Sequence, residues 1–131
     1  MDEIIIDTNF ILTSIKNKID LFYELENLFG VYEVIIGKQI FDELEKINLK
    51  KNEKFIDREN AGLAIQILNK KKIKIINFNT SDADAGIIKY VIKKPGTIVA
   101  TLDRGLKKKI KEKNPGMRFL MMRGGKKIEI A

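Results

Sequence analysis

The sequence predicts an α/β fold with a mainly parallel central sheet of about five strands and helices on both faces. Short apolar runs rich in Ile and Val have the length of buried strands, and they alternate along the chain with amphipathic segments of helical period. Gly, Pro or polar residues end most of these segments. No linker, repeat or low-complexity stretch divides the chain, so we expect residues 1–131 to form a single domain.

The first half of the chain contains two predicted strands and two helical regions. Ile4–Ile6 is β-branched throughout and predicts a strand that is buried on both faces. A helical pattern follows from Phe10 to Phe29, is interrupted near Lys16–Lys18, and ends at Gly30. Tyr32–Ile36 is the second predicted strand.

The middle of the chain predicts a helix, a loop, a second helix and a strand. Ile40, Phe41, Leu44 and Ile47 share one face of a helix that begins near Lys38. Residues 48–58 are polar and aperiodic, which predicts a loop or a short helical turn. The remaining segments are a helix over Glu59–Lys71 and a third strand over Ile73–Phe78.

The last third alternates in the same way. Asn79–Asp82 is dense in capping residues and predicts a helix start, and Lys94-Pro95-Gly96 ends that helix. A lysine-rich helix with Leu106 and Ile110 on its apolar side follows the fourth strand. The predicted strands are Thr97–Ala100, Phe119–Met122 and a short edge strand over Ile128–Ile130.

The composition restricts the chemistry that the chain can perform. Its 131 residues include neither Cys nor His, which excludes disulfides, thiolate metal sites, cysteine nucleophiles and histidine-dependent triads. An enzyme with this composition must use carboxylates, Lys, hydroxyls and a hard metal ion. No apolar run approaches a membrane span and no leader pattern opens the chain, so we expect a cytoplasmic protein with no membrane association.

The net charge of +7 is unevenly distributed. Residues 1–66 carry 8 basic and 13 acidic side chains, whereas residues 67–131 carry 17 and 5. A basic half is typical of a protein that binds a polyanion, although a solvated lysine-rich surface would have the same composition. The candidate phosphate-binding residues are Arg104, Lys107, Lys108, Lys109, Arg123, Lys126 and Lys127.

Acidic residues recur just beyond the predicted strands, namely Asp7, Glu43, Asp84 and Asp103, with Asp82 as a further candidate. The carboxyl ends of parallel strands meet at one edge, so these carboxylates should converge there. Converging like charges repel, and a divalent cation relieves that repulsion; all-oxygen ligands favour Mg²⁺ or Mn²⁺. Alternatively, each Asp is a helix N-cap, and Asp82 is the most cap-like. Asn9 and Thr101 could hold Asp7 or a water molecule.

Four motifs together resemble the PIN-domain nucleases. The motifs are Ile5-Ile6-Asp7-Thr8-Asn9, Phe41-Asp42-Glu43-Leu44, Asp82-Ala83-Asp84-Ala85-Gly86-Ile87 and Val99-Ala100-Thr101-Leu102-Asp103-Arg104-Gly105-Leu106. They occur in the family's order and span nearly the whole chain. Residues 98–122 are most similar to the branch related to the rRNA-processing endonuclease of the small-subunit processome. The toxins of toxin–antitoxin pairs are a more distant branch.

The resemblance implies a Rossmann-like, three-layer α/β/α sandwich and a metal-dependent endoribonuclease. It implies that Asp7, Glu43, Asp84 and Asp103 bind Mg²⁺ or Mn²⁺, with Asn9 and Thr101 in support. Gly105 departs from the family, because many members have an acid there, so we expect one ion. The resemblance also implies an RNA substrate and a homodimer.

Several alternatives remain open at this point. The chain could be a catalytically inactive PIN-fold subunit that binds RNA or acts as a scaffold. It could be a toxin-type ribonuclease with a regulatory protein partner, and DNA is a possible substrate. A phospho-acceptor domain is disfavoured because Arg123 and Gly124, rather than a Lys, follow the fifth predicted strand. A nucleotide-binding domain is disfavoured because no Gly-rich phosphate loop is present.

Overall fold

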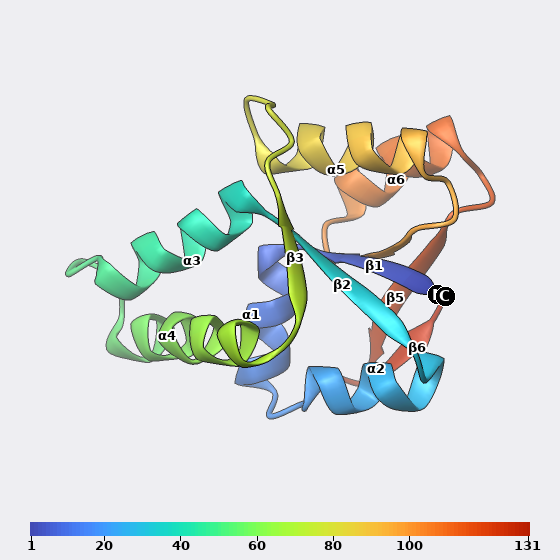
Figure 1. Ribbon diagram of the computed structural model, residues 1–131. Coiled ribbons are helices and arrows are strands. Elements are labelled where there is room, and N and C mark those ends of the chain that lie inside the picture. The colour runs from blue at the N-terminus through green and yellow to red at the C-terminus, as the bar shows by residue number, and fades with distance from the viewer.

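The computed structural model describes residues 1–131 and contains a six-stranded sheet with six helices around it (Figure 1). The strands are β1 (Asp2–Ile6), β2 (Tyr32–Gly37), β3 (Ile73–Ile76), β4 (Ile98–Ala100), β5 (Arg118–Arg123) and β6 (Lys127–Ile130). The helices are α1 (Thr8–Lys16), α2 (Leu21–Phe29), α3 (Lys38–Leu49), α4 (Phe55–Lys70), α5 (Ala83–Lys93) and α6 (Arg104–Lys113). The predicted α/β class is therefore confirmed.

The strand order is β3-β2-β1-β4-β5-β6. The first five strands are parallel, and only β6 runs antiparallel, alongside β5. The chain moves outward from β1 to β2 and β3 and then returns to the other side of β1 to form β4. In open α/β sheets, ligands bind beyond the carboxyl ends of the strands at such a reversal. The topology therefore directs attention to the ends of β1 and β4.

Helices cover both faces of the sheet and produce the predicted three layers. In Figure 1, α5 and α6 lie on one side of the sheet, and α1, α2 and α4 lie on the other. Ile4, Ile5 and Ile6 of β1 are completely buried, as their β-branched run predicts. None of the helices is both long and apolar enough to cross a membrane.

The prediction of a loop over residues 48–58 is wrong at both ends. Helix α3 continues to Leu49, and α4 already begins at Phe55, so only residues 50–54 connect them. Phe55 and Ile56 are 66% and 57% exposed. The first turn of α4 therefore has no buried face, and a prediction based on apolar periodicity could not detect it.

Strand β3 ends at Ile76, two residues before the predicted Phe78, because Phe78 turns into the core. Its ring packs against two buried glycines, and a Cβ atom would lie 2.6 Å from the ring at Gly37 and 2.5 Å from it at Gly86. Gly37 precedes α3 and Gly86 lies in the first turns of α5. Phe78 therefore fixes the starts of these two helices relative to each other.

Candidate active site

Asp7, Thr101 and Asp103 are linked by hydrogen bonds at the carboxyl ends of β1 and β4. Thr101 Oγ1 donates to Asp7 Oδ2 at 2.9 Å, and the Asp103 amide donates to Thr101 Oγ1 at 3.1 Å. The Thr8 amide donates to Asp7 Oδ1 at 2.9 Å. Thr101 is fully buried and Asp7 is 8% exposed. Both Asp7 oxygens are therefore held in place, and the central threonine orients two acids at once.

Glu43 reaches the same place from α3. Thr8 Oγ1 donates to Glu43 Oε2 at 3.3 Å across the gap between α1 and α3. Thr8 is the first residue of α1 and directly follows Asp7, so this bond brings Glu43 to the end of β1. The sequence indicated Glu43 but gave Thr8 no role, since nothing local reveals a partner 35 positions away.

Asp82 and Asp84 have different environments at the start of α5. Asp82 is the N-cap, and its Oδ1 accepts a hydrogen bond of 2.7 Å from the Ala85 amide. Asp84 lies in the first helical turn and does not cap the helix. Both acids line an open pocket of about 290 Å³, which Lys109 of α6 also lines. The cap role predicted for Asp82 is confirmed, and Asp84 is left available for a ligand.

The pKa values show that the carboxylates interact. Burial raises the pKa of Asp7, the hydrogen bonds from Thr101 and Thr8 lower it, and the charge of Asp103 raises it. Burial also raises the pKa of Asp84, and the charges of Asp7, Asp103 and Asp82 raise it further, whereas Lys109 lowers it. Asp7, Asp84 and Asp103 are therefore electrostatically coupled although three separate segments supply them. We call these three residues and Glu43 the acid site.

The acid site offers only oxygen atoms to a ligand, and its negative charges are only partly compensated. Those properties fit a hard divalent cation such as Mg²⁺ or Mn²⁺. No three acidic side chains lie close enough together to ligate one ion directly. Mg²⁺ commonly retains several waters and contacts only one or two carboxylates, so the residues present fit such an ion.

The family is decided by a match over most of the chain. The family described as a PIN-like domain matches residues 4–124, which include the whole acid site. The chain belongs to the PIN-like domain family.

Individual relatives agree with this assignment. Ribonuclease VapC4 of Methanocaldococcus jannaschii is 32% identical to this PIN domain over 115 residues, which are 87% of this chain and 86% of the relative. The structure of the PIN domain endonuclease Utp24 superimposes with a TM-score of 0.79 at 27% identity, covering 98% of this chain and 90% of that one. These relatives support a nuclease activity for this PIN domain.

Two more distant structures support the fold alone. A domain of a functionally unknown protein from Methanocaldococcus jannaschii has a TM-score of 0.62 at 15% identity, covering 95% of this chain and 93% of that one. VapBC2 from Rickettsia felis, in a structure with a DNA fragment from its promoter, has a TM-score of 0.52 at 18% identity. The coverage there is 82% of this chain and 92% of the other.

All but one of the predicted cations of this PIN domain fall on two separate surfaces. An open hollow of about 520 Å³ on α6 is lined by four basic side chains and by Glu112. We call the four basic side chains the basic face of α6: Arg104, Lys107 and Lys108, which were predicted, and Lys111, which was not. Arg123, Lys126 and Lys127 lie instead on the β5–β6 hairpin, where Arg123 pairs with Glu129 at 2.8 Å. Lys109 belongs to neither set, because it lies beside Asp84.

The basic face of α6 has no acidic partners in the ion pairs of the protein. Burial lowers the pKa of Lys107, and the charges of Lys111 and Arg104 lower it further. The cations of this surface therefore repel one another, as the carboxylates of the acid site do. The helix begins directly after Asp103, so the two surfaces are neighbours.

Asn9, although a predicted site residue, makes no hydrogen bond in the acid site. Its side chain is exposed on α1, next to Thr8, and makes no hydrogen bond to the four acids. Thr101 occupies the supporting position that was expected of both residues. Asn9 is free to contact a ligand that lies above the acid site.

Proposed function

We propose that this PIN domain is a metal-dependent endoribonuclease that hydrolyses RNA phosphodiester bonds. The observation that carries the proposal is the convergence of Asp7, Glu43, Asp84 and Asp103, from four segments, on the reversal point of the sheet. Such a cluster of carboxylates is costly without a bound cation, because burial and mutual repulsion raise the pKa values of Asp7 and Asp84. Binding of Mg²⁺ or Mn²⁺ would offset that cost.

One or two of the four carboxylates would bind the ion directly and the others through its water molecules. Hydrogen bonds hold three of the four in place, and Asp103 Oδ1 accepts one from the Leu106 amide. Asp7 is held rigidly by Thr8 and Thr101, while Glu43 is held by the Thr8 hydroxyl. When bound, Mg²⁺ or Mn²⁺ supplies positive charge for the phosphoryl oxygens and lowers the pKa of water. Lys109, beside Asp84, adds a positive charge that can contact a phosphate. Hydrolysis through this site needs no histidine.

Gly105 supports one ion per chain. A Cβ atom at Gly105 would lie 3.2 Å from Asp103 Oδ1, so an acidic side chain at this position would start next to that carboxylate. Glycine removes this additional ligand from the acid site. We therefore infer one principal ion, bound directly by one or two of the four acids and through water by the others, with Asp82 retained as the helix cap.

The basic face of α6 supports RNA as the substrate, because unpaired cations beside the acid site can contact phosphates. The similarity of residues 98–122 to the rRNA-processing branch favours a ribosomal RNA precursor. A toxin-type ribonuclease is the second candidate, since VapC4 is named a ribonuclease and is 32% identical. A PIN-fold subunit that binds RNA without cleaving it is the third.

The proposal can be tested with a labelled RNA that contains both stems and loops. Cleavage would be measured with Mn²⁺, with Mg²⁺ and with EDTA, using wild-type protein and an Asp103→Asn variant purified identically. Asparagine can also cap α6, so the variant should fold. We expect wild-type protein alone to cleave, and only with a metal ion.

Two results would contradict the proposal. Equal cleavage by both proteins would indicate a contaminating nuclease or a different site. Salt-sensitive RNA binding without cleavage on any ribosomal or messenger fragment would instead identify a binding subunit.

A further inference from the structure

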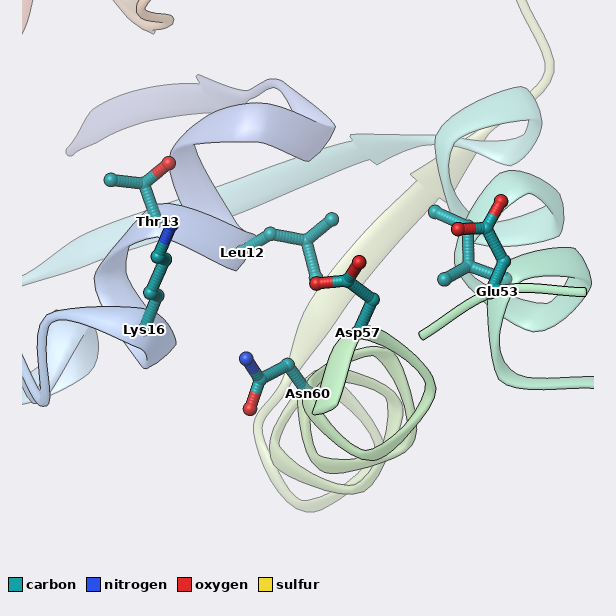
Figure 2. Close-up of a pocket in the computed structure, with 7 residues that line it drawn as sticks. Leu12, Thr13, Lys16, Glu53, Asp57 and Asn60 are labelled. Carbon is teal, nitrogen blue, oxygen red and sulfur yellow. The ribbon is translucent and has the colours of Figure 1, made fainter. Parts of the chain in front are cut away.

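A second pocket lies between α1 and the α3–α4 hairpin, away from the acid site (Figure 2). Its volume is about 240 Å³, slightly below the range of pockets for drug-sized ligands, so it suits a single ring system. We call it the side pocket. It is lined by Leu12, Thr13, Lys16, Ile47, Glu53, Asp57 and Asn60.

The side pocket lies farther along the two helices that carry Thr8 and Glu43. On α1, Leu12 lies one turn beyond Thr8, and on α3, Ile47 lies one turn beyond Glu43. Thr8 and Glu43 are hydrogen-bonded to each other, so the facing surfaces of α1 and α3 lead from the acid site into the pocket. The helical rise places the pocket about 6–12 Å along α1 from Thr8.

The pocket combines an apolar wall with polar groups that face the opening. Figure 2 shows the Asp57 carboxylate close to Leu12 and the Asn60 amide directed from α4 toward α1. The ion pairs of the protein include neither Asp57 nor Lys16, and the Glu53 carboxylate pairs only with the exposed Lys50, at 3.6 Å. Hydrogen-bonding capacity therefore remains for a ligand.

The charged groups in and around the side pocket favour the base of a nucleotide over its phosphate inside the pocket. Carboxylates repel a phosphate, but they accept hydrogen bonds from the amino and imino groups of a base, and an amide can pair with adenine. Lys16 also lines the pocket, and Lys50, Lys51 and Lys54 are exposed on the adjoining loop. Two carboxylates against one lysine inside the pocket, with further lysines on the loop, match a nucleotide whose base enters the pocket while its phosphates stay at the rim.

We propose that the side pocket binds one unpaired nucleobase that carries an exocyclic amino group, within about three nucleotides of the cleaved bond. Asp57 and Glu53 accept hydrogen bonds from the base, Asn60 pairs with its edge, and Leu12 and Ile47 contact the ring. The inference rests on the proposed nuclease function and adds a base preference to it. Uracil has one imino N–H and no amino group, so it cannot donate to both carboxylates and is the base that this pocket disfavours.

The test compares the base preferences of wild-type and variant proteins. A single-stranded RNA library with a randomised segment would be cleaved with Mn²⁺, and the new ends would be sequenced. The variants are Asp57→Asn and Asn60→Ala, neither of which belongs to the acid site. Glu59→Gln is the matched control, because Glu59 is exposed on the same helix outside the pocket.

We expect wild-type protein to disfavour uracil at least fivefold at one position near the cut. Asp57→Asn and Asn60→Ala should reduce that preference to less than twofold, whereas Glu59→Gln should retain it. On an RNA that is abasic at this position, all four proteins should cleave at similar rates. A wild-type enzyme without any preference, or an Asp57→Asn profile identical to wild type, would overturn the proposal.

Failure of the nuclease proposal gives a different result from failure of the pocket proposal. If wild-type protein cleaves no RNA, binding of decamers of A, C and U would be measured by fluorescence anisotropy. Tighter binding of A and C than of U that disappears in Asp57→Asn would support the pocket alone. Equal binding of all three decamers would overturn the pocket proposal. Binding of an oligolysine peptide that depends on Asp57, in a protein without base preference, would also overturn it and would identify a basic protein segment as the occupant.

Discussion

The acid site and the basic face of α6 are both clusters of like charge, and they are built in opposite ways. Four segments supply the acid site, where hydrogen bonds from Thr8 and Thr101 hold Asp7 and Glu43 and burial raises the pKa of Asp7. One helix supplies the basic face, whose side chains have no acidic partners and line an open hollow. A cluster held by hydrogen bonds suits one small ion in a defined geometry, whereas cations spread along an open helix face suit the phosphates of a long chain.

The same contrast explains what the sequence could predict. The basic face is visible directly in residues 104–111, because its charges recur within one helix. The acid site could be predicted only through the topology, since Asp7 and Asp103 meet when β1 and β4 are parallel neighbours. The predicted edge was correct because buried Ile and Val runs identify parallel strands well.

Contacts between distant side chains could not be predicted. The bond from Thr8 to Glu43 depends on the angle between α1 and α3, which no local pattern encodes. The start of α4 was missed because its first turn is exposed, and the side pocket depends on that turn through Asp57. The short third strand was overestimated because Phe78, an apolar residue, leaves the sheet to pack against two glycines.

Removing one carboxylate from the acid site should have the largest effect on RNA cleavage. Asp7→Asn keeps the size of the side chain but removes a charge from the acid site. We expect RNA cleavage to fall by about 10³-fold, the order seen when a single electrostatic group is removed from an active site. Cleavage rates at saturating Mn²⁺ would measure it, with circular dichroism as the control for folding. Wild-type rates would exclude Asp7 from the reaction.

Removing a hydrogen bond that holds the acid site in place should have the next largest effect on RNA cleavage. Thr101→Val removes the hydroxyl that donates to Asp7 and accepts from the Asp103 amide. We expect a loss of about 10–100-fold, typical of groups that orient metal ligands, together with a higher Mn²⁺ requirement. Thr97→Val is the matched control, because the buried Thr97 hydroxyl has no partner and its loss should leave activity unchanged.

Removing cations from the basic face of α6 should weaken RNA binding without slowing the cleavage step. A Lys107→Ala and Lys111→Ala double variant should raise KM several-fold at about 0.15 M salt while kcat stays within about twofold. Each lost phosphate contact reduces the salt dependence of log affinity by about 0.7 for a single strand. RNA affinity measured over a series of salt concentrations would test this, with Lys74→Ala, an exposed lysine of β3, as control. An unchanged slope would remove α6 from the RNA path.

The smallest expected effect is on the thermal stability of the protein in the absence of a metal ion. The pKa of Asp84 is raised by burial and by neighbouring acids, so its ionised form is disfavoured in the folded state. This destabilisation grows as the pH rises through the raised pKa, and it is absent below the ordinary value of 3.8, where the group is protonated in both states. In EDTA at pH 7, Asp84→Asn should therefore raise Tm by about 1–3 °C. Thermal melts at pH 3 and pH 7 would show whether the gain disappears in acid.

The most direct test of the account is a calorimetric titration of Mn²⁺ into three proteins: wild type, Asp84→Asn and Asp82→Asn. The last two substitutions remove the same charge two residues apart, and the asparagine introduced by Asp82→Asn can still cap α5. We expect one ion per wild-type chain, at least about tenfold weaker binding in Asp84→Asn, and little change in Asp82→Asn. Equal affinities in all three proteins would contradict the proposal that the acid site holds the ion.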